Sequence, residues 1–170
     1  WDEAFAAVAK RLKGINGKKV AALAGDLADC ESMMALKDLM TALGSPHFDC
    51  RQDGAAVAAD PRVSYLFNTT IAGIENADAC LLIGTNPRWE ASLVNARIRK
   101  RYLLGGFPIA AVGPALDLTY SYERLGAGPE TLSDIVAGRH PFHAVLVSAE
   151  RPMLILGQGA LARLDGTAVL

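Results

Sequence analysis

Three features are scarce in this sequence: cysteine, an excess of charge of either sign, and long apolar runs. The 170 residues include only three cysteines, Cys30, Cys50 and Cys80, and no two of them form a Cys-x-x-Cys pair. An iron–sulfur cluster usually takes four thiolates, so we expect no cluster in this chain. An odd number of isolated cysteines is typical of reduced thiols rather than of a disulfide framework.

The charge balance and the apolar runs exclude two further classes of protein. Lys and Arg number 17 against 18 Asp and Glu, for a formal net charge of −1. With no basic excess to displace phosphate counterions, we expect no nucleic-acid binding. The longest apolar runs are six or seven residues. Crossing a bilayer takes ~18–20 apolar residues, so no direct membrane insertion is expected.

Apolar residues are abundant, at 51% of the chain, and their arrangement indicates parallel strands. Content and length together predict one domain over residues 1–170. Four continuous apolar runs each end on a glycine, and they are residues 20–25, 80–84, 109–113 and 153–157. This pattern is typical of parallel strands buried on both faces, and residues 46–50 indicate a less clear fifth strand. Because the chain begins at Trp1 and stops in an apolar run at Leu170, we expect an excised fragment of a larger multidomain chain.

Helical patterns lie between these runs. Apolar residues recur on one face of residues 1–14 and 33–44, and residues 89–103 show the same spacing with four basic residues in the last turns. Residues 131–137 are expected to form a short helix, and residues 51–70 mostly a loop. The alternation of strands and helices predicts an α/β fold with a doubly wound, mostly parallel sheet flanked by helices.

The most informative motif is Gly84-Thr85-Asn86-Pro87-Arg88, which follows a predicted strand and precedes a predicted helix. Asn86 suits the N-cap, and Pro87 suits the first helical position because the N–H that it lacks would be unpaired there anyway. Turns of this kind lie where open α/β sheets bind ligands, with backbone N–H groups directed at a phosphate. The same residues also describe a well-capped turn without a ligand.

Three other patterns are weaker. Residues 157–162 read G-x-G-x-x-A after a predicted strand, and we interpret these glycines as an ordinary turn. His140 and His143 have no further ligand close in sequence, so no metal site is expected there. Cys50 follows the possible strand at 46–50, where a thiolate could bind a metal, although a structural cysteine is the default interpretation. The sequence shows no nucleophile elbow and no carboxylate pair, so we name no catalytic residue.

Several segments taken together resemble one family. They are residues 66–75 (LFNTTIAGIE), 83–88 (IGTNPR), 95–100 (NARIRK), 112–114 (VGP), 117–120 (DLTY) and 140–142 (HPF). Their order and spacing resemble the large iron–sulfur subunit of respiratory complex I, the NADH:quinone oxidoreductase of bacteria, which is called the 75 kDa subunit in mitochondria. The resemblance covers nearly the whole chain. It falls on the region of that subunit that is similar to molybdopterin oxidoreductases.

The resemblance implies a structural, cofactor-free domain within a subunit that takes part in electron transfer from NADH to quinone. The iron–sulfur clusters would lie in the amino-terminal part of the parent chain, and the fragment alone is not expected to be catalytic. Its partners would be other domains of the parent chain and other hydrophilic-arm subunits of complex I. The resemblance places it in a peripheral arm, on the cytoplasmic side of the bacterial inner membrane or on the matrix side in mitochondria.

The same resemblance supports an alternative, a pterin guanine dinucleotide-binding domain of a genuine molybdoenzyme. In such enzymes the G-x-N-P turn helps hold the dinucleotide, which would assign Gly84, Asn86 and Pro87 to its phosphates. They often ligate molybdenum through a cysteine in an earlier loop, and Cys50 is the candidate ligand under this alternative. We favour the structural domain, in which no residue binds a cofactor or metal, because residues 68–73 and 95–99 point to complex I. The alternative loses support if Asn86 only caps its helix and if Cys50 is closed to solvent.

Overall fold

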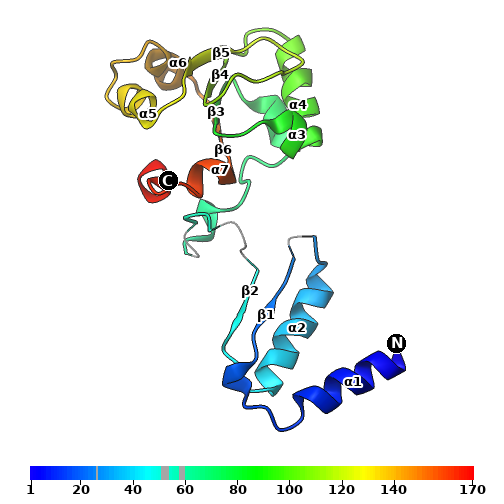
Figure 1. The fold of residues 1–170 in the computed structure, drawn as a ribbon. Helices are drawn as coiled ribbons and strands as arrows, with labels where there is room; N and C mark the ends of the chain where they lie inside the picture. The colour runs from blue at the N-terminus through cyan, green and yellow to red at the C-terminus, as the bar shows by residue number, and fades with distance from the viewer. Residues whose placement is uncertain (26, 51–53, 58–59) are drawn as a thin grey trace. The chain divides into compact units, whose positions relative to one another are not determined.

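The computed structural model describes residues 1–25, 27–50, 54–57 and 60–170, and the chain divides into two compact units (Figure 1). The first unit is Trp1–Gln52 and the second is Asp53–Leu170. One sheet has two strands and the other has four. The single domain over residues 1–170 stays a prediction.

The first unit pairs two short strands beside two helices. Its elements are α1 (Asp2–Leu12), η1 (Gly17–Lys19), β1 (Ala22–Leu23), α2 (Cys30–Ala42) and β2 (Phe48–Asp49). β1 and β2 are parallel and lie within two of the segments predicted as strands. The N-cap of α2 is Asp29, whose Oδ1 accepts a hydrogen bond from the Ser32 N–H at 2.6 Å. Met40 is buried on α2, whereas α1, which is described throughout, buries none of its side chains.

The second unit is built from short helices and strands. In chain order they are η2 (Arg62–Ser64), η3 (Ala72–Asn76), β3 (Ala79–Ile83), α3 (Pro87–Glu90), α4 (Ser92–Leu103), β4 (Ile109–Val112), β5 (Glu123–Gly126), α5 (Pro129–Val136), α6 (Phe142–Ser148), β6 (Pro152–Leu156), α7 (Gln158–Leu161) and α8 (Gly166–Val169). Of the loop predicted over 51–70, residues 51–53 and 58–59 lie outside the described residues, and η2 falls in the remainder. Among the described residues of the whole chain, no helix combines the length and the apolar character needed to cross a membrane.

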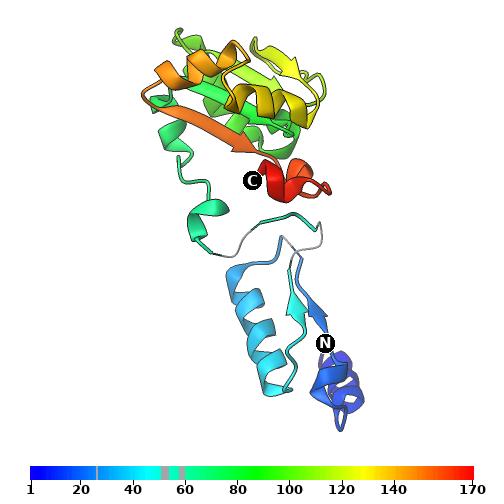
Figure 2. The same ribbon diagram turned by 90° about the vertical axis from the view of Figure 1, so that its left-hand side faces the viewer.

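The four-stranded sheet has the order β5-β4-β3-β6, and every neighbouring pair is parallel. From β3 the chain moves through β4 to β5 and then crosses back to β6 on the other side of β3. Figures 1 and 2 show α3 and α4 on one face of this sheet and α5 and α6 on the other. The predicted α/β fold with a doubly wound parallel sheet is therefore confirmed. The change of winding direction lies between β3 and β6.

The core lies on both faces of β3. Cys80 and Leu82, which have no exposed area, pack in a cluster with Ile98 of α4. Leu81 belongs to the opposite cluster, together with Ile135 of α5. Because side chains alternate along a strand, a strand covered on both faces needs apolar residues at every position. This is why the sequence of β3 is a continuous apolar run.

One predicted helix is divided in the structure, and two further elements, β5 and α6, have no counterpart among the predicted strands and helices. The helix expected over 89–103 is divided into α3 and α4 at Ala91, whose ψ of 68° interrupts the helical backbone. β5 is an edge strand with its first two side chains exposed, so it lacks an apolar run. α6 begins at Phe142, directly after Pro141, because proline is tolerated where a helix starts.

Candidate functional site

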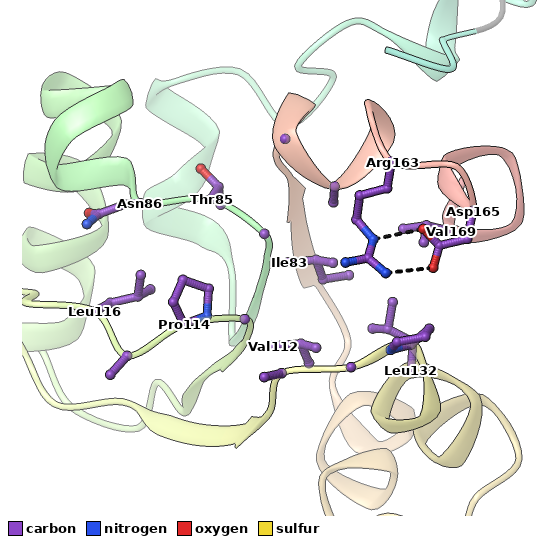
Figure 3. A pocket seen from close by; sticks show the side chains of 18 of the residues that line it. Ile83, Thr85, Asn86, Val112, Pro114, Leu116, Leu132, Arg163, Asp165 and Val169 are labelled. Carbon is purple, nitrogen blue, oxygen red and sulfur yellow. Dashed lines mark hydrogen bonds and ion pairs between the residues drawn. The ribbon is translucent and has the colours of Figure 1, made fainter. Parts of the chain in front are cut away.

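A pocket of about 360 Å³ opens at the carboxyl ends of the strands in the second unit. Its lining comes from the turns after β3, β4 and β5 and from the segments of α5, α7 and α8 (Figure 3). The apolar part of the lining includes Ile83, Val112, Leu116, Leu132 and Val169. Open α/β sheets bind ligands at this edge, beside the change of winding direction. The pocket thus includes the turn that the sequence singles out.

Gly84 ends β3 and allows the turn to approach α7 closely. Its φ of +56° lies in the left-handed region that favours glycine. A Cβ at this position would lie 2.7 Å from the Cβ of Ala160, and a Cβ at Gly157 would lie 2.3 Å from the Gly84 carbonyl oxygen. The close approach that glycine permits is therefore made by the protein's own segment. Of residues 157–162, which the sequence interprets as an ordinary turn, Gly157 is the N-cap and Gln158–Leu161 form the short helix α7.

Asn86 and Pro87 start α3 as the sequence predicts for a capped turn. The Asn86 side-chain oxygen accepts a hydrogen bond from the backbone N–H of Arg88 at 3.2 Å. Pro87 occupies the first helical position, and its side chain is fully buried. The burial is an additional role that the sequence pattern does not indicate.

Glu90 makes contacts in this turn that sequence reasoning misses. One carboxylate oxygen accepts a hydrogen bond from the backbone N–H of Asn86 at 2.8 Å. The other accepts one from the hydroxyl of Thr85 at 2.7 Å. The only signal in the sequence is an acidic residue in the first turn of a helix, where a negative charge is favourable. It lies one position beyond the place that a capping box would give it.

Arg163 and Asp165 form an ion pair at another side of the pocket. Nε and Nη2 of Arg163 donate to the two carboxylate oxygens of Asp165 at 2.8 and 3.0 Å (Figure 3). The hydrogen bond between them raises the pKa of Arg163 and lowers the pKa of Asp165, so both groups stay charged. Together with Glu90, the described lining holds one cation and two carboxylates, a formal charge of −1.

The loop after β4 is held in place by the side chains of Tyr122, just before β5, and of Arg88 in α3. The hydroxyl of Tyr122 accepts a hydrogen bond from the Leu116 N–H at 2.6 Å and donates one to the Leu116 carbonyl at 3.0 Å. Arg88 of α3 contacts the Asp117 carboxylate at 2.5 Å. These contacts fix the loop that lines the pocket against the turn at residues 84–88.

A comparison of the sequence with known protein families shows to which family the chain belongs. Residues 1–170 match the family model described as molybdopterin oxidoreductase. The chain belongs to the molybdopterin oxidoreductase family.

Three relatives within this comparison carry names of respiratory enzymes. The chain is 46% identical to NADH dehydrogenase (ubiquinone) iron-sulfur protein 1, mitochondrial, of Solanum tuberosum, over 99% of this chain and 23% of that protein. It is 41% identical to the NADH-ubiquinone oxidoreductase 75 kDa subunit of Reclinomonas americana, over 100% of this chain and 27% of the relative. It is 40% identical to an NADH-quinone oxidoreductase subunit of Rickettsia felis, over 100% of this chain and 25% of that protein. The predicted resemblance is confirmed, and the chain spans about a quarter of the length of these curated relatives.

The family name implies a molybdopterin cofactor, so the pocket residues can be compared with what a pterin dinucleotide needs. Its phosphates need free hydrogen-bond donors and positive charge. The Thr85 hydroxyl and the Asn86 N–H are already bonded to Glu90, and Arg163 is paired with Asp165. The formal charge of the lining is negative. The pocket residues of this chain therefore do not fit the phosphates of a polyanionic dinucleotide.

The described residues that line the pocket do not include Cys50, His140 or His143. Cys50 belongs to the first unit and is exposed after β2. Thus Asn86 caps its helix, as the structural interpretation requires, whereas the thiol of Cys50 is open to solvent. His140 and His143 hydrogen-bond backbone atoms around the α5–α6 connection. Within the described ranges, no group of three or more His, Cys, Asp or Glu side chains is arranged to hold a metal ion.

Proposed function

We propose that this chain is a structural, cofactor-free domain of the large iron–sulfur subunit of a complex I-type NADH:quinone oxidoreductase. The observation that carries the proposal is the similarity over essentially the whole chain, at 40–46% identity, to relatives with those names. Electron transfer from NADH to quinone is then an activity of the parent complex. Its iron–sulfur clusters would be bound by the amino-terminal part of the parent chain.

The cofactor-free part of the proposal is supported by the chemistry of the pocket. A resident dinucleotide would have to displace the carboxylate of Glu90 from two hydrogen bonds and separate Arg163 from Asp165. Each exchange breaks a charge-assisted hydrogen bond. The ligand would also bring its own negative charges to a lining that already carries a formal charge of −1. Both effects oppose phosphate binding.

We further propose that the domain packs against other domains of the parent chain and against other subunits of the hydrophilic arm. The exposed apolar side chains of α1 and its N-cap, Trp1, Phe5 and Val8, support such contacts. Burial of apolar surface is the main driving force for association, and apolar patches on a surface often mark interfaces. The arm would lie on the cytoplasmic side of the bacterial inner membrane, or on the matrix side in mitochondria.

Metal analysis of the intact NADH:quinone oxidoreductase that contains this chain tests the proposal. The complex is purified from molybdenum-replete cells, with a molybdoenzyme from the same cells as positive control. We expect iron in stoichiometric amounts, molybdenum far below one atom per complex, and no pterin released on oxidation. Stoichiometric molybdenum would establish the alternative. If the chain did not copurify with NADH-oxidising activity, its assignment to the complex would be wrong.

A further inference from the structure

The turn after β3 is hydrogen-bonded to a carboxylate of the same chain, that of Glu90. We propose that Glu90 is the residue that closes this turn to phosphate-bearing ligands, because its carboxylate takes the hydrogen bonds that a ligand phosphate would need. The inference rests on the proposed function and deepens it. It names the side chain that makes a pocket of this family unsuitable for the family's dinucleotide.

The geometry shows how the Glu90 carboxylate bonds two donors of the turn. Its two oxygens are divided between the two donors, one bonded to the Asn86 N–H at 2.8 Å and the other to the Thr85 hydroxyl at 2.7 Å. Both distances are typical of strong hydrogen bonds to a charged acceptor. A phosphate could reach these donors only by displacing Glu90. Since Glu90 is four residues from Asn86 on the same chain, it competes as an intramolecular ligand.

The surrounding charges act in the same direction. The guanidinium of Arg163, which could attract an anion, is held by both oxygens of Asp165. The negative charge of Glu130 also contributes to the raised pKa of Arg163. A phosphate in the pocket would therefore meet like charges on two sides. Replacing Glu90 with alanine would free the Asn86 N–H and the Thr85 hydroxyl and would remove one negative charge.

The test is a titration of the ¹⁵N-labelled chain with inorganic pyrophosphate at low ionic strength, followed through the backbone amide signals of residues 84–86. Four proteins are compared: wild type, Glu90→Ala, Glu90→Gln and Glu3→Ala. Glu3→Ala is the matched control, because it removes the same charge from α1, in the other unit. Circular dichroism and the dispersion of the amide signals establish that each variant is folded.

We expect saturable shifts in Glu90→Ala, with pyrophosphate bound at least about tenfold more tightly than by wild type, the ratio set by one charge-assisted hydrogen bond. Wild type and Glu3→Ala should not reach saturation over the pyrophosphate concentrations that saturate Glu90→Ala. A folded Glu90→Ala without such shifts, or a wild type that binds equally well, would overturn the inference. Should Glu90→Ala fail to fold, Glu90→Gln decides: tighter binding than wild type supports the inference and equal binding overturns it. Either result leaves the proposed function to the separate measurement of molybdenum in the complex.

Discussion

Truncation of Leu82 should be among the most damaging substitutions in the second unit. Leu82 lies in the middle of β3 and has no exposed area. Its register neighbours are Ala111 on β4 and Ile155 on β6, so hydrogen-bonded strands on both sides prevent the backbone from closing around a cavity. Leu→Ala changes in cores cost about 2–5 kcal/mol, depending on how far the site relaxes. For Leu82→Ala we expect about 3–5 kcal/mol, because this site can relax little.

Urea unfolding measures this loss. With an m-value of about 2 kcal/mol/M, the midpoint should fall by about 1.5–2.5 M. Using a Trp1→Phe background leaves Trp89 as the fluorescence reporter, and Trp89 lies in the second unit. Leu154→Ala is the matched control, because Leu154 lies on the edge strand β6 and is 56% exposed, so it should cost less than about 1 kcal/mol. Equal losses for the two variants at unchanged m would show that β3 is not the central strand.

Three further predictions concern the turn, a thiol and an ion pair. Gly84→Ala should cost about 2–4 kcal/mol, because the new Cβ would lie on a left-handed backbone and overlap α7. Gly105 also has a left-handed backbone, with a φ of +80°, but open space surrounds it. Gly105→Ala should therefore cost only about 1 kcal/mol in the same urea assay. Burial raises the pKa of Cys80 to about 12, so Ellman's reagent should titrate only the two exposed thiols of the native protein, and a third native equivalent would contradict the fold. Chiefly the hydrogen bond from Lys100 lowers the pKa of Glu75, so its contribution is present at neutral pH and is lost as the pH falls below 4.5 towards the folded-state pKa. The Tm of wild type should accordingly exceed that of Glu75→Gln at pH 7, with the difference shrinking towards pH 3, and a difference independent of pH would refute this assignment.

The strands at the centre of the sheet could be predicted from the sequence because burial on both faces leaves a direct trace. β3 and β4 are apolar at every position, and each is followed by a glycine. β5 leaves no such trace, because an edge strand with Glu123 and Arg124 exposed has no reason to be apolar. The break at Ala91 is not predictable from the sequence either, since alanine is a good helix former and tertiary context can override such a preference.

The backbone path of the candidate site could be predicted from the sequence, but the contacts between its side chains could not. Asn86 and Pro87 have local preferences for the start of a helix, so the cap follows from residue type. The pairing of Arg163 with Asp165 and the approach of Ala160 to Gly84 depend on where α7 packs, which no local preference encodes. Sequence reasoning therefore located the turn correctly and could not determine whether its donors were free.

This distinction explains how one motif can belong to both a cofactor-binding domain and a structural one. Gly84, Asn86 and Pro87 set the path of the backbone, and that path is equally useful for presenting N–H groups to a ligand and for starting a helix. Under the proposed function, a residue outside the motif favours the second use, since the Glu90 carboxylate bonds the Asn86 N–H and the Thr85 hydroxyl from within the chain. The internal carboxylate occupies these two donors, and a phosphate could bond them only by displacing it. We therefore expect replacement of Glu90 to change the capacity of the turn to bind a phosphate without changing the backbone path.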